Sequence, residues 1–258
     1  KNWLKKKKSK KKKQKEIIID NFMQEIAQIR KLSLWIFFIP FVAINFCLLI
    51  SQNPEFLEST IFEVDQIGRS AFSIPYLDGS LSISRAARTF PQYLIFKPSM
   101  ILTSVLLFVY WKTNNDLVNK LYGAENNYKF KTFGILSAIF LIIHSIFLGI
   151  KFDIQIYKLF RRVVLVLFII FELIAQGCLV YHFYKLKTKL ENLINNKILI
   201  IKILLVSILI LVAILSLPTL VTKGNTHIKH MLEWNYFVGV ILFYFLSRLF
   251  WKANHINF

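Results

Sequence analysis

Long runs of apolar residues dominate the chain, and short polar connections separate them. A helix needs about 20 predominantly apolar residues to cross the hydrocarbon core of a bilayer. Six segments meet this requirement, some marginally, at 32–51, 93–111, 133–150, 159–184, 198–218 and 232–251. They lack the alternation of apolar and polar positions that a transmembrane β-barrel needs. The pattern therefore predicts an all-α, multi-pass membrane protein with six transmembrane helices.

Composition and charge add an orientation to this picture. Hydrophobic residues make up 55% of the 258 residues, which is more than a soluble domain of this size carries. Ten of the first fifteen residues are lysine, and basic residues mark the cytoplasmic side of membrane proteins. We therefore expect the N-terminus and, with six spans, also the C-terminus to be cytoplasmic. The basic run is expected to bind anionic lipid, and no nucleic-acid partner is predicted.

Three parts follow from these patterns. A basic cytoplasmic tail occupies 1–31, and its residues 16–30 have the helical spacing of an interfacial amphipathic helix. The six-helix transmembrane domain covers 32–252, with one long, ordered extracytoplasmic loop at 52–96. A short cytoplasmic end remains at 253–258. The expected location is the plasma (inner) membrane in a bacterium or an endomembrane in a eukaryote.

The connection 151–162 departs from the charge rule. It is predicted on the outside, although it holds four basic residues and one acidic residue. Either the tail and the first helix determine the orientation, or Arg161 and Arg162 bind the phosphates of lipid headgroups.

The loop segment 75–98 is the most distinctive polar stretch, with three prolines, one glycine and two arginines. If it is helical, Arg85 and Arg88 share one face and either hold a phosphate or pair with carboxylates of the loop. Ser82 and Ser84 are candidate nucleophiles, but the G-x-S-x-G elbow is missing. Serines more often cap turns and helix starts, so a structural role is favoured.

Polar side chains inside the predicted spans are further candidates, because such groups are expensive in lipid and have partners. They are Asn45, His144, and the pair Glu172 and Gln176 on one helix face. His144 is a candidate partner for Glu172, which is either a neutral structural group or part of a proton or ligand path. Lys202 lies one turn inside its span and is expected to snorkel to the interface.

The stretch T-H-I-K-H-M-L-E-W places His227, His230 and Glu233 at intervals of three, followed by Trp234. Two histidines and a glutamate are zinc ligands in some proteins. Here the H-E-x-x-H arrangement and an obvious fourth ligand are missing, so neither a metal nor a cofactor is predicted. As an alternative to an interfacial role, either histidine is a candidate base for a serine nucleophile.

The spacing of these two stretches resembles a known family. Ser82-Ile83-Ser84, then six residues and Pro91, then four residues and Phe96, resembles the signature loop of FRAG/DRAM/SFK-type membrane proteins. The histidine before Glu233-Trp234 at the start of the last span is similar to a second signature of that family. The family includes damage-regulated autophagy modulators and a factor that remodels GPI-anchor lipids. Arg85 departs from its pattern, which commonly has an acidic residue there.

The resemblance implies a six-span bundle with cytoplasmic ends and a lipid-linked role in sensing, handling or supporting the remodelling of lipids. The expected lipid-binding residues line a headgroup-sized pocket and are Arg85, Arg88, His230, Glu233 and Trp234. This non-catalytic role is favoured over two alternatives. One is an intramembrane lipid hydrolase or acyltransferase, and the other is a structural subunit with membrane-protein partners.

Overall fold

The computed structural model describes residues 2–62, 73–123, 128–150, 155–221 and 224–252. Within these ranges the secondary structure is helical, apart from one isolated β-bridge between Ile194 and Trp251. The prediction of an all-α protein is therefore confirmed. The predicted connection 151–162 lies partly outside the described residues, and the predicted C-terminal end at 253–258 lies wholly outside them.

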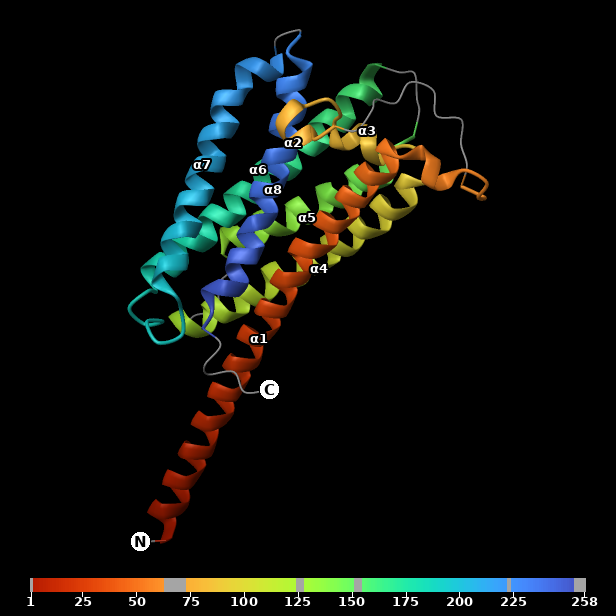
Figure 1. Ribbon diagram of the computed structural model, residues 1–258. Helices are drawn as coiled ribbons and strands as arrows, with labels where there is room; N and C mark the ends of the chain where they lie inside the picture. The colour runs from red at the N-terminus through yellow and green to blue at the C-terminus, as the bar shows by residue number, and fades with distance from the viewer. Residues whose placement is uncertain (1, 63–72, 124–127, 151–154, 222–223, 253–258) are drawn as a thin grey trace.

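Six long helices form the molecule (Figure 1). They are α1 (Asn2–Gln52), α4 (Gln92–Tyr122), α5 (Lys129–Phe147), α6 (Gln155–Lys185), α7 (Asn196–Val221) and α8 (Thr226–Phe250). In the described part of the segment between α1 and α4 lie the short helices η1 (Pro54–Leu57), α2 (Pro75–Asp78) and α3 (Ile83–Ala87). Successive long helices run in opposite directions, so α1 begins and α8 ends at the same end of the bundle. We call this end the tail end, and the end that carries α2 and α3 the loop end.

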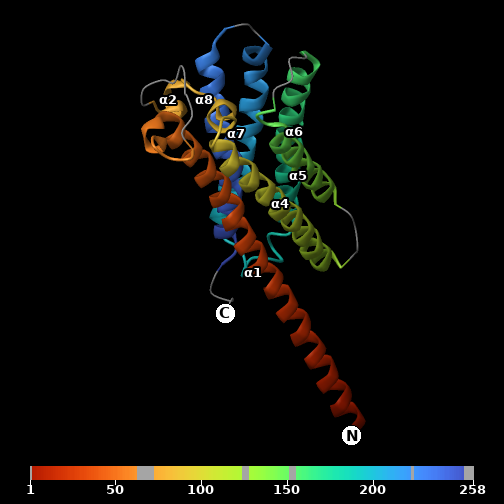
Figure 2. The same cartoon turned by 90° about the vertical axis from the view of Figure 1, so that its right-hand side faces the viewer.

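The long helices pack as a closed ring, in which each helix contacts the next in chain order and α8 returns to α1. Figure 2 shows α1 extending beyond the other helices at the tail end. The ring brings the start of α8 beside the loop that follows α1, although these segments are far apart in sequence. The fold thus juxtaposes the two polar stretches that the sequence singles out.

Among the described residues, five helical segments are long and apolar enough to cross a membrane, so the chain has the helices of a multi-pass membrane protein. They are Phe22–Gln52, Gln92–Tyr122, Lys129–Phe147, Leu159–Lys185 and Asn196–Ser216. The sixth predicted span lies in α8, which runs the length of the bundle but is not among these five. Polar side chains in its first three turns lower its apolar character. Six spans and the sidedness of the ends therefore stay predictions.

The basic tail and the first span form one helix in the structure. No glycine or proline interrupts α1 before Pro40, so nothing in the backbone breaks the helix between tail and span. Ile26 and Ile29, expected on the apolar face of a separate interfacial helix, are buried in the bundle core. The candidate span Phe22–Gln52 contains the predicted span 32–51. Binding of the tail to anionic lipid stays a prediction.

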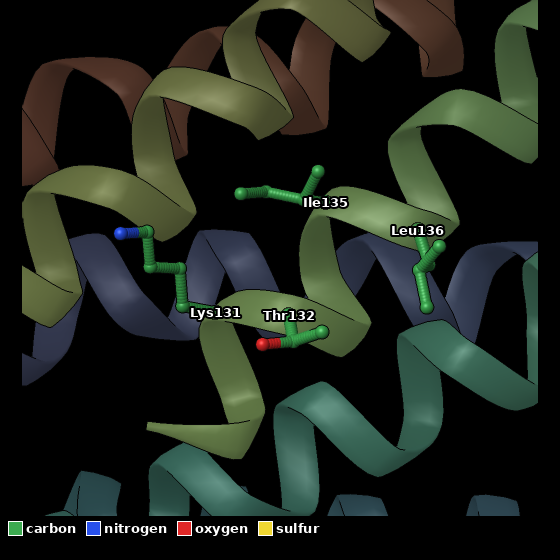
Figure 3. A pocket seen from close by; sticks show the side chains of 4 residues that line it. All are labelled: Lys131, Thr132, Ile135 and Leu136. Carbon is green, nitrogen blue, oxygen red and sulfur yellow. The ribbon is translucent and has the colours of Figure 1, made fainter. Parts of the chain in front are cut away.

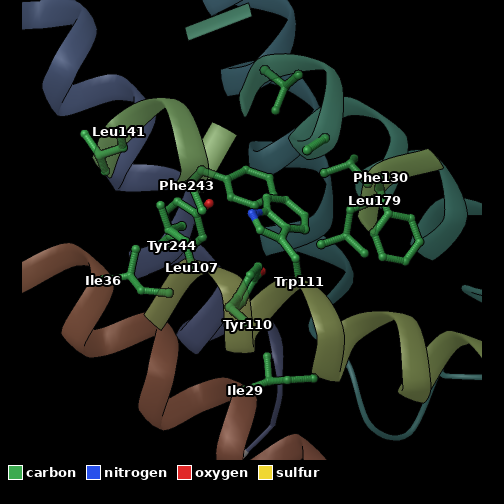
Figure 4. Packing of buried hydrophobic residues seen from close by; sticks show 14 of the residues in the cluster. Ile29, Ile36, Leu107, Tyr110, Trp111, Phe130, Leu141, Leu179, Phe243 and Tyr244 are labelled. Atoms are coloured by element: carbon green, nitrogen blue, oxygen red, sulfur yellow. The ribbon is translucent and has the colours of Figure 1, made fainter. Parts of the chain in front are cut away.

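The core is rich in aromatic side chains, among them Trp111 of α4, Phe130 of α5 and Phe243 of α8 (Figure 4). Trp111 packs edge-on against Tyr110 and Tyr244, with ring centroids 5.1 and 6.4 Å apart. Gly134 leaves room for the indole, because a Cβ at that position would lie 2.3 Å from the Trp111 ring. Close packing of this kind holds helices together where lipid offers no hydrophobic driving force.

The outward faces are apolar, as expected for surfaces that contact lipid. On α7, for example, Ile200 and Leu215 are each 65% exposed. Lys202 on the same helix differs from the prediction that it snorkels to the interface, since it is only 1% exposed. It points into the bundle toward Ser247 instead, and its partners are considered below.

Candidate functional site

The loop around α2 lies across the first turns of α8. The indole Nε1 of Trp234 donates a hydrogen bond of 2.7 Å to the carbonyl oxygen of Leu81. The side-chain amide of Asn235 donates to the carbonyl oxygen of Tyr76 at 2.8 Å. The rings of Tyr76 and Trp234 also pack edge-on, with centroids 4.8 Å apart. The structure thus brings the 75–98 stretch and the head of the last helix into direct contact.

Both histidines of α8 hold the same loop. Nδ1 of His227 lies 3.2 Å from the carbonyl oxygen of Asp78, and Nδ1 of His230 lies 3.0 Å from that of Gly79. A carbonyl oxygen only accepts, so each Nδ1 carries the hydrogen. Burial lowers the pKa of His230, and the positive charge of Arg85 acts in the same direction. The histidines are therefore loop anchors.

The turn after α2 requires glycine for two reasons. Gly79 has a φ of +61°, and a Cβ there would lie 1.8 Å from the carbonyl oxygen of His227. The carboxylate of Asp78 accepts hydrogen bonds from the backbone amides of Ile74 at 2.9 Å and Ser80 at 2.8 Å. These bonds, with that from Ser80 contributing most, hold the pKa of Asp78 below its usual value. The turn is thus rigid enough to seat its backbone against α8.

Helix α1 also holds the loop, and its contact is with Tyr76, a residue that the sequence pattern did not single out. The hydroxyl of Tyr76 donates to Oδ1 of Asn45 in α1 at 2.9 Å. Asn45 in turn donates to the carbonyl oxygen of Phe41 at 2.8 Å. The intramembrane Asn45 therefore ties the loop to α1. Only the Pro-x-x-Asp-Gly turn around Tyr76 signals this role in the sequence.

Helix α3 places two arginines on its exposed side. Ser82 caps α3 by accepting a hydrogen bond from the Arg85 backbone amide at 3.2 Å. Ile83, Ala86 and Ala87 are buried against the bundle, while Arg85 and Arg88 are exposed.

Arg161 of α6 reaches α3, with a guanidinium nitrogen 3.4 Å from the hydroxyl oxygen of Ser84. We call Arg85, Arg88 and Arg161 the arginine cluster. Partial burial, together with the positive charges of Arg85 and Arg161, lowers the pKa of Arg88. Nε of Arg161 is buried without a hydrogen-bond partner among the described residues.

One carboxylate is tied to the cluster. Glu233 accepts a hydrogen bond from the backbone amide of Ser84, the residue whose hydroxyl contacts Arg161. The described residues record no ion pair for Arg85, Arg88 or Arg161. Among the described residues, three guanidinium groups without a recorded ion pair therefore lie near the buried carboxyl group of Glu233.

The hydroxyls of the two candidate serines make contacts within the loop and with α6. Ser82 serves as a helix cap, and the Ser84 hydroxyl faces Arg161. Among the described residues, neither hydroxyl contacts His227 or His230, whose Nδ1 atoms hold the loop. The part of the chain that the structure describes contains no group of three or more potential metal ligands. The zinc and serine-hydrolase alternatives gain no support from this geometry.

The remaining polar residues of the predicted spans lie in two separate places, Glu172 with Gln176 in one and His144 in the other. Glu172 is contacted by Ser137, Gln176 and Tyr244, so the predicted pairing with His144 is wrong. His144 lies instead near Arg161, on the turn of α5 that reaches the loop end. Spacing along the sequence cannot show this, because it does not tell which helix faces meet.

A shallow hollow elsewhere on the surface is unrelated to the arginine cluster. It is lined by Lys131, Thr132, Ile135 and Leu136 at the start of α5, at the tail end (Figure 3). No protein-family model, no curated protein and no solved structure matches the chain.

Proposed function

We propose that the protein has a lipid-linked role in a membrane, and that its loop end binds the phosphate of a lipid headgroup. The observation that carries this proposal is the convergence of Arg85, Arg88 and Arg161. Guanidinium groups bind phosphate through paired, charge-assisted hydrogen bonds. A phosphate beside α3 supplies the negative charge that this cluster lacks and an acceptor for the orphaned Nε of Arg161.

The α8 residues have a supporting role in this proposal. Trp234 and His230 hold the backbone of the loop, so they fix where α3 begins. Glu233 binds the Ser84 amide and orients α3 directly. The groups predicted to line a pocket therefore divide into phosphate-binding arginines and residues that position them.

The proposed location of the site is the extracytoplasmic surface. The lysine-rich connections and the tail belong to the opposite end of the bundle, which the charge rule assigns to the cytoplasm. The exposed apolar faces of the long helices surround the ring below α3. A headgroup at the cluster then lies at the interface while its acyl chains contact these faces. This arrangement accords with the resemblance to FRAG/DRAM/SFK-type proteins.

Lipid retention by the full-length protein tests the proposal. The purified protein in detergent is titrated with phosphatidylglycerol, and bound lipid is counted by native mass spectrometry. Replacing Arg161 by Ala removes charge-assisted hydrogen bonds of about 1.5–3 kcal/mol, so affinity should fall about tenfold or more. Arg162→Ala is the matched control, because this neighbouring arginine is exposed and lies outside the cluster.

Two further experiments show which part of the protein retains the lipid and whether a free anion binds there instead. The basic tail is present in every variant, so its own lipid binding does not distinguish them. Competition by inorganic phosphate shows whether the cluster binds a free anion rather than a lipid. Equal lipid retention by wild type, Arg161→Ala and the triple alanine variant of the cluster would refute the proposal. In that case the arginines pair with loop carboxylates such as Glu63 and Asp65, which lie outside the described residues.

A further inference from the structure

A set of buried polar contacts lies among the aromatic side chains of the core, away from the loop end. At its centre is Glu172 of α6, which is 1% exposed. The Gln176 side-chain amide, one turn later, donates to Oε1 of Glu172 at 2.9 Å. The hydroxyl of Tyr244 from α8 donates to the same oxygen. An ionisable group at such a position in a membrane bundle is unusual enough to require an account of its charge.

The number of hydrogens available to these contacts bears on the charge of this carboxyl group. The Ser137 hydroxyl oxygen lies 2.8 Å from the carbonyl oxygen of Gly134 and 2.6 Å from Oε2 of Glu172. A hydroxyl has one hydrogen, and the Gly134 carbonyl oxygen only accepts. Serine commonly back-bonds to a carbonyl oxygen of the preceding turn in a helix. When the Ser137 hydrogen goes to Gly134 in this way, the hydrogen between Ser137 and Glu172 comes from the carboxyl group.

We propose that Glu172 is a neutral carboxylic acid that donates to Ser137 and forms an exchangeable proton-binding site in the core of the bundle. Both of its oxygens are satisfied in this state. Oε1 accepts from Gln176 and Tyr244, and Oε2 donates to Ser137. Loss of the proton would leave a carboxylate in a low-dielectric interior with two oxygen lone pairs facing each other at 2.6 Å. This inference is independent of the lipid proposal.

Titratable groups of the neighbouring helices face this site. From α8, Tyr244 binds Glu172 directly, and from α4, Tyr110 packs edge-on against Tyr244 with centroids 5.0 Å apart (Figure 4). Tyr110 donates to the hydroxyl of Ser247 at 3.1 Å, and Nζ of Lys202 from α7 donates to the same oxygen at 2.7 Å. From α5, Ser137 contributes a hydroxyl that does not titrate.

Among the described residues, Lys202 makes its contacts with Ser247 and two aromatic rings, and none is recorded with Glu172. Its Nζ lies 4.1 Å from the centroid of the Phe243 ring and 5.2 Å from that of Phe250. Aromatic faces stabilise a buried ammonium group. Among the described residues, the contacts of Lys202 and those of Glu172 are linked through Ser247 and the rings of Tyr110 and Tyr244.

Infrared difference spectroscopy of the full-length protein in lipid vesicles at neutral pH tests the proposal. Subtracting the Glu172→Gln spectrum from that of the wild type should reveal one protonated carboxyl band. That band should shift after equilibration in D₂O. Glu25→Gln is the control, because Glu25 forms an ion pair with Lys120 at 2.6 Å and should show carboxylate bands instead.

Ser137→Ala keeps the test decisive if Glu172→Gln does not fold. It removes the acceptor of the carboxyl hydrogen, so the protonated band should persist but move to higher frequency. Carboxylate bands in the Glu172 difference spectrum would overturn the proposal. A band that stays unshifted in D₂O would overturn the exchangeable site, and an unchanged band in Ser137→Ala would overturn the hydrogen-bond assignment.

Discussion

The indole of Trp234 and the backbone of Leu81 are joined by a hydrogen bond of 2.7 Å across 153 residues of sequence. Trp234 is fully buried. It also packs against Tyr76, which reaches α1 through Asn45. One side chain of α8 therefore connects the loop that carries α3 with the first and last helices of the ring, and the placement of the arginine cluster depends on it.

Replacing Trp234 by Phe should loosen this connection. The variant retains a ring but leaves the Leu81 carbonyl without its donor, at a cost of about 1–3 kcal/mol. We expect a lower thermal midpoint in detergent and faster hydrogen exchange in residues 75–81. Trp35→Phe is the control, since Trp35 is 49% exposed on the outside of α1 and should change neither quantity. Equal behaviour of the two variants would contradict this role for Trp234.

Replacing Gly79 by Ala should displace the loop from α8. The new methyl group would lie 1.8 Å from the His227 carbonyl oxygen, so the backbone must move and the His230 contact must lengthen. Gly123→Ala is matched in backbone conformation, with a φ of +71°, but its methyl group meets nothing within 4 Å. Thermal unfolding and hydrogen exchange should therefore show a larger loss for Gly79→Ala. A similar loss in both variants would mean that backbone strain alone explains the effect.

The Asp78 carboxylate should stabilise its turn over a defined pH range. Its pKa is lowered from 3.8 in the folded state, chiefly by the Ser80 amide. A lowered folded pKa means that the stabilisation is complete above the usual value and is lost as pH falls through the lowered one. The ratio of hydrogen-exchange rates between Asp78→Asn and wild type at residues 74–80 reports it. This ratio should stay constant down to about pH 4 and approach one below it, and a decline starting near neutral pH would contradict the assignment.

Much of the fold is readable from apolar runs, because length and hydrophobicity alone decide whether a helix can cross a bilayer. The helix boundaries were less predictable. Charge suggested a break near Lys31, but α1 continues because helix formers fill both sides of that position. Lys202 looked like a snorkelling residue, and it is buried because Phe243, Phe250 and Ser247 receive it.

The candidate site, like the fold, could be predicted from the sequence only in part. The spacing of Arg85 and Arg88 predicts a shared helix face, and α3 shows both on its exposed side. Arg161 and Arg162 looked equivalent, but only Arg161 reaches Ser84. The partners of Asn45 and Glu172 depend on how α1, α5, α6 and α8 are rotated against one another. That rotation follows from side-chain packing over long sequence distances, which a single sequence does not display.

The central claim is that the arginine cluster binds a lipid phosphate, and a structure of the full-length protein in phosphatidylglycerol-containing nanodiscs tests it most directly. The claim predicts a headgroup phosphate within hydrogen-bond distance of Arg85, Arg88 and Arg161, with Nε of Arg161 donating to it. The same phosphate should be missing in the Arg161→Ala variant and present in Arg162→Ala. Guanidinium groups paired with carboxylates of the chain, and no phosphate beside α3, would contradict the claim.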